Sequence, residues 1–168
     1  MEEIVNKVAK SGLITLDLST WLADESFIEI DLAPLLWQGL VLREDEFRDW
    51  IKNHDWASYQ NKHVAVFCST DAIVPLWAYM LVSSALVGIA KTCINTSSAE
   101  LRNMVFVEKI SAFNLESIRD CRIVIKGCNE GKVPDFAYGL LVSKIQAVVK
   151  SLMFGEPCST VPVYKKKK

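Results

Sequence analysis

From residue 63 onward, short apolar runs alternate with longer stretches of helical spacing, and this alternation constrains the fold more than any other feature of the sequence. The apolar runs cover residues 64–67, 122–126 and 151–154, and a further short run covers 91–95; all have the length of strands. The stretches between them, about 75–88, 97–110 and 134–150, carry helix-start signals such as Pro75, Pro134 and a Ser97/Glu100 capping box. The alternation predicts an α/β fold with a mostly parallel sheet flanked by helices.

The first 60 residues do not keep this alternation. Residues 13–18 and 27–31 alternate apolar and polar side chains as half-exposed strands do, and residues 44–53 indicate a helix with an acidic first turn. We expect this less regular portion to add antiparallel strands or a cap to the same core. Since no linker or internal repeat stands out, we predict one α/β domain over 1–168: an irregular portion (1–60), an alternating core (61–164) and a basic tail (165–168).

Composition excludes several classes of protein. Apolar residues make up 51% of the chain and the net charge is −1, which argues against disorder, and the near-neutral balance gives no sign of nucleic-acid binding. Charge is nevertheless uneven, because residues 1–56 hold 12 acids and 5 bases whereas residues 121–168 hold 3 acids and 9 bases. We interpret Lys165–Lys168 as a solvated end, with a contact to an anionic partner or membrane surface as the alternative. A contact between the acidic and basic ends, within or between subunits, is also left open.

The sequence predicts a cytoplasmic location and no membrane contact. Its start is acidic where a secretory signal is basic, and five cysteines without an export signal favour a reducing compartment. Residues 72–90 carry no formal charge and reach the length of a membrane span. Because Pro75, the Ser83–Ser84 pair and Gly88 interrupt this run, we predict instead a helix buried on all sides within a globular domain.

Three cysteines follow predicted strands and define the candidate site. Cys68, Cys128 and Cys158 each come just after an apolar run, and the carboxyl ends of parallel strands share one sheet edge, where ligands bind. We therefore predict a ligand site of Cys68, Cys128 and Cys158, with Asp71 and Glu156 as supporting acids. Helix N-termini nearby favour thiolates, which bind metals or attack electrophiles. The alternative is that these thiols are inert and buried, as we expect for Cys93 and Cys121.

His54 and His63 are the two histidines of the chain. His54 falls on the same helix face as Phe47 and Trp50, and we interpret it as a hydrogen-bonded residue facing the core, with a role as metal ligand or base as the alternative. His63 precedes a strand, and we expect it to be exposed. The loops at Gly127–Gly131 and Gly155–Cys158 match neither a P-loop, nor a dinucleotide fingerprint, nor a nucleophile elbow.

Several segments together resemble a bacterial family classed as a domain of unknown function. The resemblance runs from about Asn6 to Tyr164 and is carried by Asn53-His54-Asp55-Trp56, Cys68-Ser69-Thr70-Asp71-Ala72-Ile73-Val74-Pro75, Val124-Ile125-Lys126-Gly127-Cys128 and Gly155-Glu156-Pro157-Cys158-Ser159-Thr160-Val161-Pro162. It implies a role around cysteine, sulfur or iron chemistry, with protein partners in iron–sulfur assembly.

These observations predict a non-enzymatic binding or accessory protein that holds a metal ion or an iron–sulfur cluster, or handles sulfur, through Cys68, Cys128 and Cys158 with His54 as a further metal ligand. One alternative is an enzyme with a cysteine nucleophile and His54 or Asp71 as its partner. The other is a scaffold that works by its surface, with incidental thiols. A homodimer is a further expectation, with Trp21 and Trp56 as candidate anchors of the interface.

Overall fold

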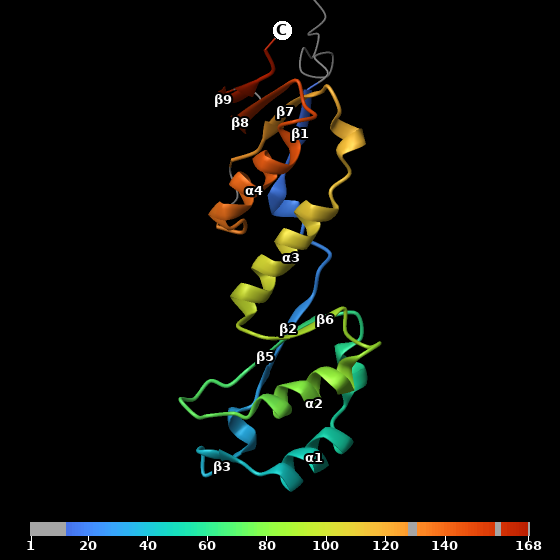
Figure 1. Ribbon diagram of the computed structural model, residues 1–168, viewed down its shortest axis with the longest axis vertical. Helices are drawn as coiled ribbons and strands as arrows, with labels where there is room; N and C mark the ends of the chain where they lie inside the picture. Colours follow the sequence, from blue (N-terminus) through green and yellow to red (C-terminus); the bar gives the residue numbers. More distant parts are fainter. Residues whose placement is uncertain (1–12, 128–130, 157–158, 168) are drawn as a thin grey trace, which may run out of the picture. The chain divides into compact units, whose positions relative to one another are not determined.

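The structure, a computed structural model, describes residues 13–127, 131–156 and 159–167 (Figure 1). The chain divides into two compact units: unit 1 holds the described residues up to Ala23 and from Val105 onward, and unit 2 is Asp24–Met104. The predicted class is confirmed, since each unit has a parallel or mostly parallel sheet flanked by helices. That residues 1–168 form a single domain stays a prediction.

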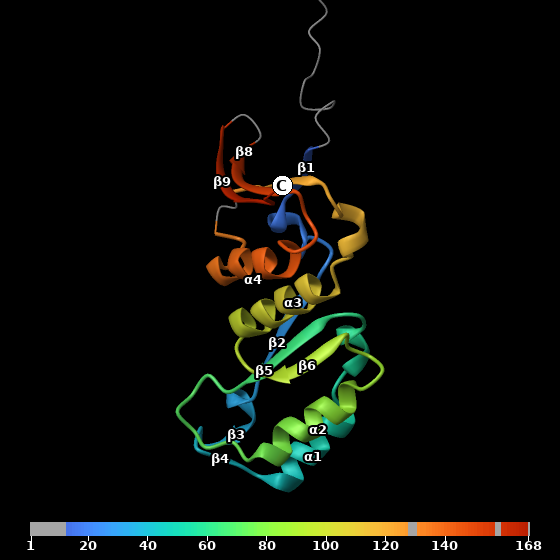
Figure 2. The ribbon, with the colours of Figure 1, turned by 45° about the horizontal axis from the view of Figure 1, so that its top comes forward.

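Unit 2 is built on a three-stranded parallel sheet in the order β2-β5-β6. These strands are β2 (Phe27–Asp31), β5 (His63–Phe67) and β6 (Thr92–Asn95). Two short strands, β3 (Leu36–Trp37) and β4 (Val41–Leu42), form a separate antiparallel pair. Helices α1 (Glu44–Asn53) and α2 (Leu76–Leu86) lie side by side (Figure 2).

The core of unit 2 lies between the sheet and its two helices. Helix α1 begins with three acidic residues, which suits the positive end of the helix dipole, and it buries Phe47. Helix α2 buries Ala78, Val82 and Leu86, which recur every four residues and so face one side. These side chains meet Ile30, Val64 and Val66 from the sheet.

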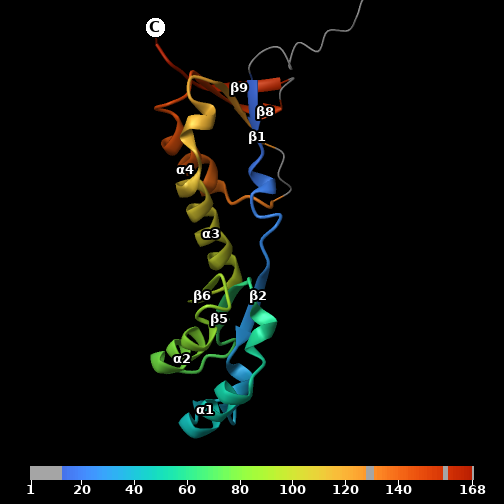
Figure 3. The same ribbon diagram turned by 90° about the vertical axis from the view of Figure 1, so that its right-hand side faces the viewer.

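Unit 1 is built on a four-stranded sheet in the order β1-β7-β8-β9. Its strands are β1 (Leu13–Leu16), β7 (Arg122–Ile125), β8 (Ser151–Glu156) and β9 (Ser159–Lys165), with α4 (Asp135–Ile145) on one side of them (Figure 3). The first three strands are parallel, and β9 folds back antiparallel onto β8. Helix α3 (Ser98–Ala112) crosses the boundary between the units in the sequence, and its last turns contribute Phe106 and Ile110 to the core of unit 1.

The two units repeat the same order of elements, which the sequence analysis missed. In unit 2 the order is β2, α1, β5, α2 and β6. In unit 1 it is β1, the end of α3, β7, α4 and β8. From α1 onward, equivalent positions lie 59 residues apart, as Phe47 and Phe106 do. Pro75 and Pro134 occupy the same place before α2 and α4, with φ/ψ of −61°/142° and −68°/143°.

The repeat extends to backbone hydrogen bonds. The Lys91 N–H donates to the Lys62 carbonyl at 2.9 Å, and the equivalent Lys150 N–H donates to the Cys121 carbonyl at 2.8 Å. A sequence signal does exist, because Val-Pro-x-(Trp/Phe)-Ala-Tyr-x-Leu begins at both Val74 and Val133. The rest of the repeat is hidden because different apolar side chains fill equivalent core positions.

Three expectations from the sequence differ from the structure. The N-terminal portion was expected to add antiparallel strands, but β1 pairs parallel with β7, and β2 pairs parallel with β5. Among the described residues of this portion, only β3 and β4 pair antiparallel. Helix α4 ends at Ile145 rather than near residue 150. Helix α2 is not buried on all sides, since Leu76 and Met80 are 73% and 69% exposed.

Candidate functional site

The carboxyl edge of the unit 2 sheet is organised by Asp31, the last residue of β2. Its Oδ1 accepts hydrogen bonds from the backbone N–H groups of Ala33 at 2.9 Å and Ser69 at 3.0 Å, and its Oδ2 accepts one from the Ser69 hydroxyl at 2.6 Å. The Ser69 hydroxyl is the main reason that the pKa of the Asp31 carboxyl lies below its usual value. Asp31 therefore clamps the loop that follows β5.

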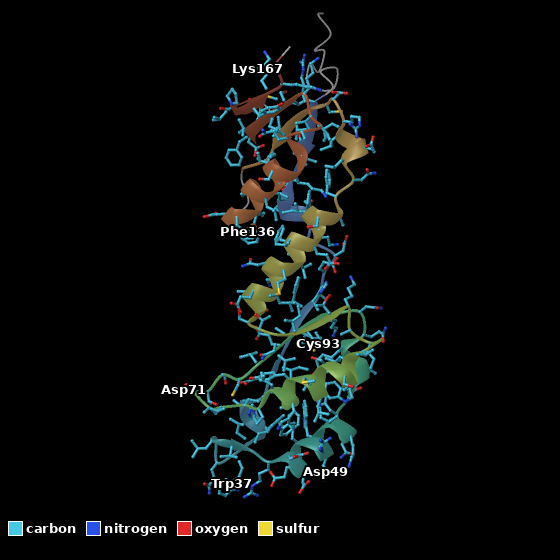
Figure 4. The ribbon with its side chains drawn as sticks, in the orientation of Figure 1. Trp37, Asp49, Asp71, Cys93, Phe136 and Lys167 are labelled. Carbon is cyan, nitrogen blue, oxygen red and sulfur yellow. The ribbon has the colours of Figure 1, made fainter. Side chains whose placement is uncertain are left out.

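Cys68 is presented by this clamped loop and is half-buried. Its Sγ lies 3.3 Å from the Thr70 hydroxyl, and Tyr79 is close enough for a negative charge on Cys68 to add to the effect of burial, which raises the pKa of the Tyr79 phenol. None of these neighbours carries the positive charge that stabilises a reactive thiolate. Asp71, predicted as a supporting acid, is exposed on the same loop (Figure 4).

The strand that precedes Cys68 does not belong to the same sheet as the strands that precede the other two cysteines. Strand β5, which precedes Cys68, belongs to the three-stranded sheet, whereas β7 and β8, which precede Cys128 and Cys158, belong to the four-stranded sheet. The prediction required one parallel sheet, whereas the described parallel strands form two. Cys128 and Cys158 themselves lie outside the described residues, so a site that includes them stays a prediction.

Glu156 ends β8 at the same edge where β7 leads toward Cys128. The two strands are parallel neighbours, with Ile125 opposite Phe154. The Oε1 atom of Glu156 is buried, and none of the described residues forms a hydrogen bond with it. Buried carboxylate oxygens are normally hydrogen-bonded or bound to a cation, so this atom marks the edge as a place where a ligand could be stabilised.

The equivalent edge of unit 1 repeats the carboxylate clamp at Asp17. Its Oδ1 accepts from the Ser19 backbone N–H at 3.0 Å and from the Ser19 hydroxyl at 2.5 Å, and its Oδ2 accepts from the Lys126 ammonium at 3.0 Å. The hydrogen bond from the Ser19 hydroxyl is the main reason that the pKa of the Asp17 carboxyl is lowered. Neither clamp was predicted, although Asp31 ends the strand pattern at 27–31 and Asp17 lies one residue before the end of the pattern at 13–18.

His54 lies within an aromatic cluster and not beside a cysteine. Its ring centroid is 4.5 Å from those of Trp50 and Trp56, and its Nε2 is 2.9 Å from the Tyr59 hydroxyl. The interpretation of His54 as a hydrogen-bonded residue facing the core is therefore confirmed. In the part of the chain that the structure describes, no three His, Cys, Asp or Glu side chains are placed to hold a metal ion.

His63 was expected at the surface, and this expectation is wrong, because β5 is the central strand and is covered on both faces. The residue is only 5% exposed. Its Nε2 is 3.0 Å from the Glu25 Oε2, its Nδ1 is 3.2 Å from the Thr92 hydroxyl, and its ring stacks on Phe27. Lys91 binds the same Glu25 oxygen at 2.6 Å. With both ring nitrogens engaged, His63 has a structural role.

The remaining described thiols are held by local contacts. Burial raises the pKa of the Cys93 thiol, whose Sγ lies 3.5 Å from the Ser83 hydroxyl. The Cys121 Sγ donates to the Arg119 carbonyl at 3.4 Å. These contacts agree with the structural role predicted for both cysteines.

A shallow hollow in unit 2 has a volume of about 240 Å³. Its wall consists of Pro34, Leu35, Leu36, Trp37, Glu46 and Phe47. Pockets for cofactor-sized molecules are usually about 300–1,000 Å³, so this hollow suits a single side chain better than a cofactor. The guanidinium of Arg43 lies 4.2 Å from the Trp37 ring and is also paired with Glu46.

Within the described residues, the structure contains no helix that is both long and apolar enough to cross a membrane. Helix α2, which takes up most of the uncharged run, has only 11 residues.

Comparison with known proteins agrees with the resemblance seen in the sequence. No curated protein and no solved structure matches the chain. The model of one family, described as a protein of unknown function (DUF2480), matches residues 2–166. Because that match covers nearly the whole chain, the protein belongs to the DUF2480 family.

Proposed function

We propose that this protein is a non-enzymatic binding or accessory protein with a cysteine-lined ligand site at the carboxyl edge of the unit 1 sheet. The observation that carries the proposal is the buried Oε1 of Glu156 at the end of β8, which has no hydrogen-bond partner among the residues that the structure describes. Cys158 follows Glu156 by two residues, and Cys128 follows the end of the neighbouring β7 by three. The ligand set proposed is therefore Cys128, Cys158 and Glu156.

The chemistry of these donors favours a metal ion. Thiolates with a carboxylate are suitable ligands for zinc or for iron, including iron in a cluster, and two cysteines with one glutamate leave room for a further donor from solvent or a partner. A bound cation would also compensate the buried Glu156 oxygen. Cys68 and His54 are not part of this ligand set, because the residues that they contact, Thr70 and Tyr59, belong to unit 2. Their role as metal ligands stays a prediction from the sequence. A part in iron–sulfur assembly, implied by the family resemblance, is the finer form of the same proposal.

The structure offers less support to the alternative of a cysteine-dependent enzyme. The proposed base His54 is hydrogen-bonded to Tyr59, and Cys68 contacts Thr70. A nucleophilic cysteine needs a base or a positive charge within hydrogen-bond reach. The scaffold alternative requires only a surface, and is addressed by the same experiment.

The test is metal analysis of the full chain purified without oxygen, followed by titration with Co²⁺ and measurement of the thiolate-to-cobalt absorbance. We expect about one equivalent of bound metal, and its loss in Cys128→Ser, Cys158→Ser and Glu156→Gln. Cys93→Ser and Cys121→Ser are matched controls and should retain the metal. Absence of both metal and the cobalt band would overturn the proposal. In that event, one fast-alkylating thiol would favour the enzyme, and five slow ones the scaffold.

A further inference from the structure

The outer face of α2 is apolar although it is exposed to solvent. Ile73, Leu76, Met80 and Val87 are 92%, 73%, 69% and 80% exposed, respectively. Leu76 and Met80 lie one turn apart on the same face of α2, whereas Ile73 and Val87 flank the helix before its first residue and after its last. We call these four residues the α2 stripe.

The internal repeat shows that the fold does not require apolar residues at these positions. The residues equivalent to Ile73, Leu76, Met80 and Val87 on and around α4 are Lys132, Asp135, Gly139 and Gln146. All four are exposed as well. The two helices therefore present the same face to solvent, and the same structural position carries charged, small or polar side chains in one unit and large apolar ones in the other.

An exposed apolar stripe that the fold does not need indicates a surface covered by another molecule. The stabilisation of α2 comes from its opposite face, where Ala78, Val82 and Leu86 are buried. Exposing the α2 stripe to water is unfavourable, and no contact of these side chains within the described part of unit 2 offsets that cost. From this we propose that the α2 stripe is the contact surface of a homodimer, in which α2 of one chain packs against α2 of a second copy.

Charge favours a second copy as the occupant. The run from Ala72 to Ala90 has no formally charged residue, so pairing it with itself brings no like charges together. A two-fold contact places the same patch on both sides, which an uncharged apolar stripe satisfies and a charged one does not. A basic or acidic partner would instead select a face with charges of the opposite sign.

The neighbouring helix α1 carries part of its charge in ion pairs, with Glu44 2.8 Å from Arg48 and Asp49 3.3 Å from Lys52. These pairs reduce the repulsion between two copies that the excess of acids in α1 causes.

The tryptophans predicted to anchor a dimer are engaged within their own units. Trp21 stacks on Phe113 with ring centroids 5.3 Å apart, and the Trp56 indole N–H donates to the Ile51 carbonyl at 2.8 Å. We therefore assign the dimer contact to the α2 stripe and not to Trp21 and Trp56.

The test compares the mass of the full chain in solution with that of a variant whose stripe carries the residues of α4. Light scattering after size exclusion, and sedimentation at several concentrations, should give twice the chain mass of 18.9 kDa for the unchanged protein. The variant Ile73→Lys/Leu76→Asp/Val87→Gln should be a monomer, with affinity weakened at least roughly a hundredfold, because it places unpaired charges in the contact. It should fold, since α4 folds with these residues, and circular dichroism checks this.

Two further proteins keep the test decisive. The matched control Lys132→Ala/Asp135→Ala/Gln146→Ala alters the equivalent face of α4 and should leave the dimer intact. The single variant Met80→Lys should weaken the dimer by itself if the triple variant does not fold. A monomer for the unchanged protein up to about 100 μM, or a dimer that survives both stripe variants, would overturn the proposal. None of these outcomes depends on metal binding, so the two proposals stand or fall separately.

Discussion

Asn61 and Asp120 occupy the same place in the two units of the chain, two residues before β5 and two residues before β7, which is an inner strand of its sheet as β5 is. Both have a positive φ, 58° and 54°, in the left-handed region. The Asn61 N–H donates to the Ile89 carbonyl at 2.9 Å, and the Asp120 N–H donates to the Val148 carbonyl at 2.8 Å. Both halves of the repeat thus contain the same turn. It needs an unusual backbone conformation, and its N–H group donates a hydrogen bond to the segment after the following helix.

This turn predicts a matched pair of substitutions. Asn61→Val and Asp120→Val should each lower the free energy of unfolding by about 1–3 kcal/mol, because a β-branched residue is strained at positive φ. Asn61→Gly and Asp120→Gly should keep or raise it, since glycine adopts this conformation freely. Urea denaturation of the four variants measures the difference. Equal stabilities for valine and glycine at either site would contradict the prediction.

The equivalent phenylalanines Phe47 and Phe106 predict local effects of similar size. Each is 2% exposed, and they lie in different hydrophobic clusters. We expect Phe47→Ala and Phe106→Ala each to cost about 3–5 kcal/mol through the cavity they create. Hydrogen exchange should show faster exchange in β2, β5 and β6 for the first variant, and in β1, β7 and β8 for the second. Identical exchange patterns would show that the two clusters do not act separately.

Two glycines of unit 1 predict opposite outcomes of the same substitution. Gly155 has a φ of +120°, and a Cβ there would lie 2.6 Å from the Ser159 carbonyl oxygen, so Gly155→Ala should destabilise the β8–β9 hairpin by at least about 1–3 kcal/mol. Gly139 lies inside α4 with open space where a Cβ would lie, so Gly139→Ala should stabilise the protein by about 0.5–1 kcal/mol. Thermal unfolding of both variants gives the signs, and a stabilising Gly155→Ala would contradict the geometry.

The carboxylate clamps predict a dependence of stability on acidic pH. The pKa of Asp31 is lowered in the folded chain, mainly by the hydrogen bond from the Ser69 hydroxyl. The stabilisation is therefore complete above the unfolded pKa, about 3.9, and is lost as the pH falls through the lower folded value. Asp31→Asn should reduce stability at pH 7 and flatten its decline below about pH 4.

The control for this prediction is Asp71→Asn, which changes an exposed carboxylate on the neighbouring loop. Urea midpoints measured from pH 7 down to about pH 2.5 should follow the unchanged protein for this control. An unaltered acid profile in Asp31→Asn would show that the clamp does not contribute. Asp17→Asn should behave like Asp31→Asn, because the pKa of Asp17 is also lowered.

Much of the local structure could be predicted from the sequence. Helix α1 begins and ends where its acidic first turn and apolar spacing predicted, at Glu44 and Asn53. The capping box of α3 forms as predicted, with the Glu100 N–H donating to the Ser97 hydroxyl at 3.2 Å and the Ser97 N–H donating to Glu100. These features depend on residues within one turn of each other, so local sequence is sufficient to specify them.

The candidate site depended on information that local sequence lacks. The prediction placed Cys68 beside Cys128 and Cys158 by assuming that all parallel strands share one sheet, but β5 pairs with β2 and β6, and β7 pairs with β1 and β8. The burial of His63 was missed for the same reason, because the strand order, which the sequence does not show, makes β5 the central strand of its sheet. The choice of strand neighbours is made by contacts between residues far apart in the chain.

The sequence by itself determined where most of the strands and helices lie, that α3 begins at a capping box, and that the chain is an α/β protein, because these depend on periodicity and on hydrogen bonds between near neighbours. Only the tertiary structure decided that the parallel strands divide between two sheets, which strands are neighbours, and that the uncharged helix α2 turns an apolar face to solvent. An apolar side chain has the same pattern in the sequence whether it faces a core or another molecule, and only the folded chain distinguishes the two.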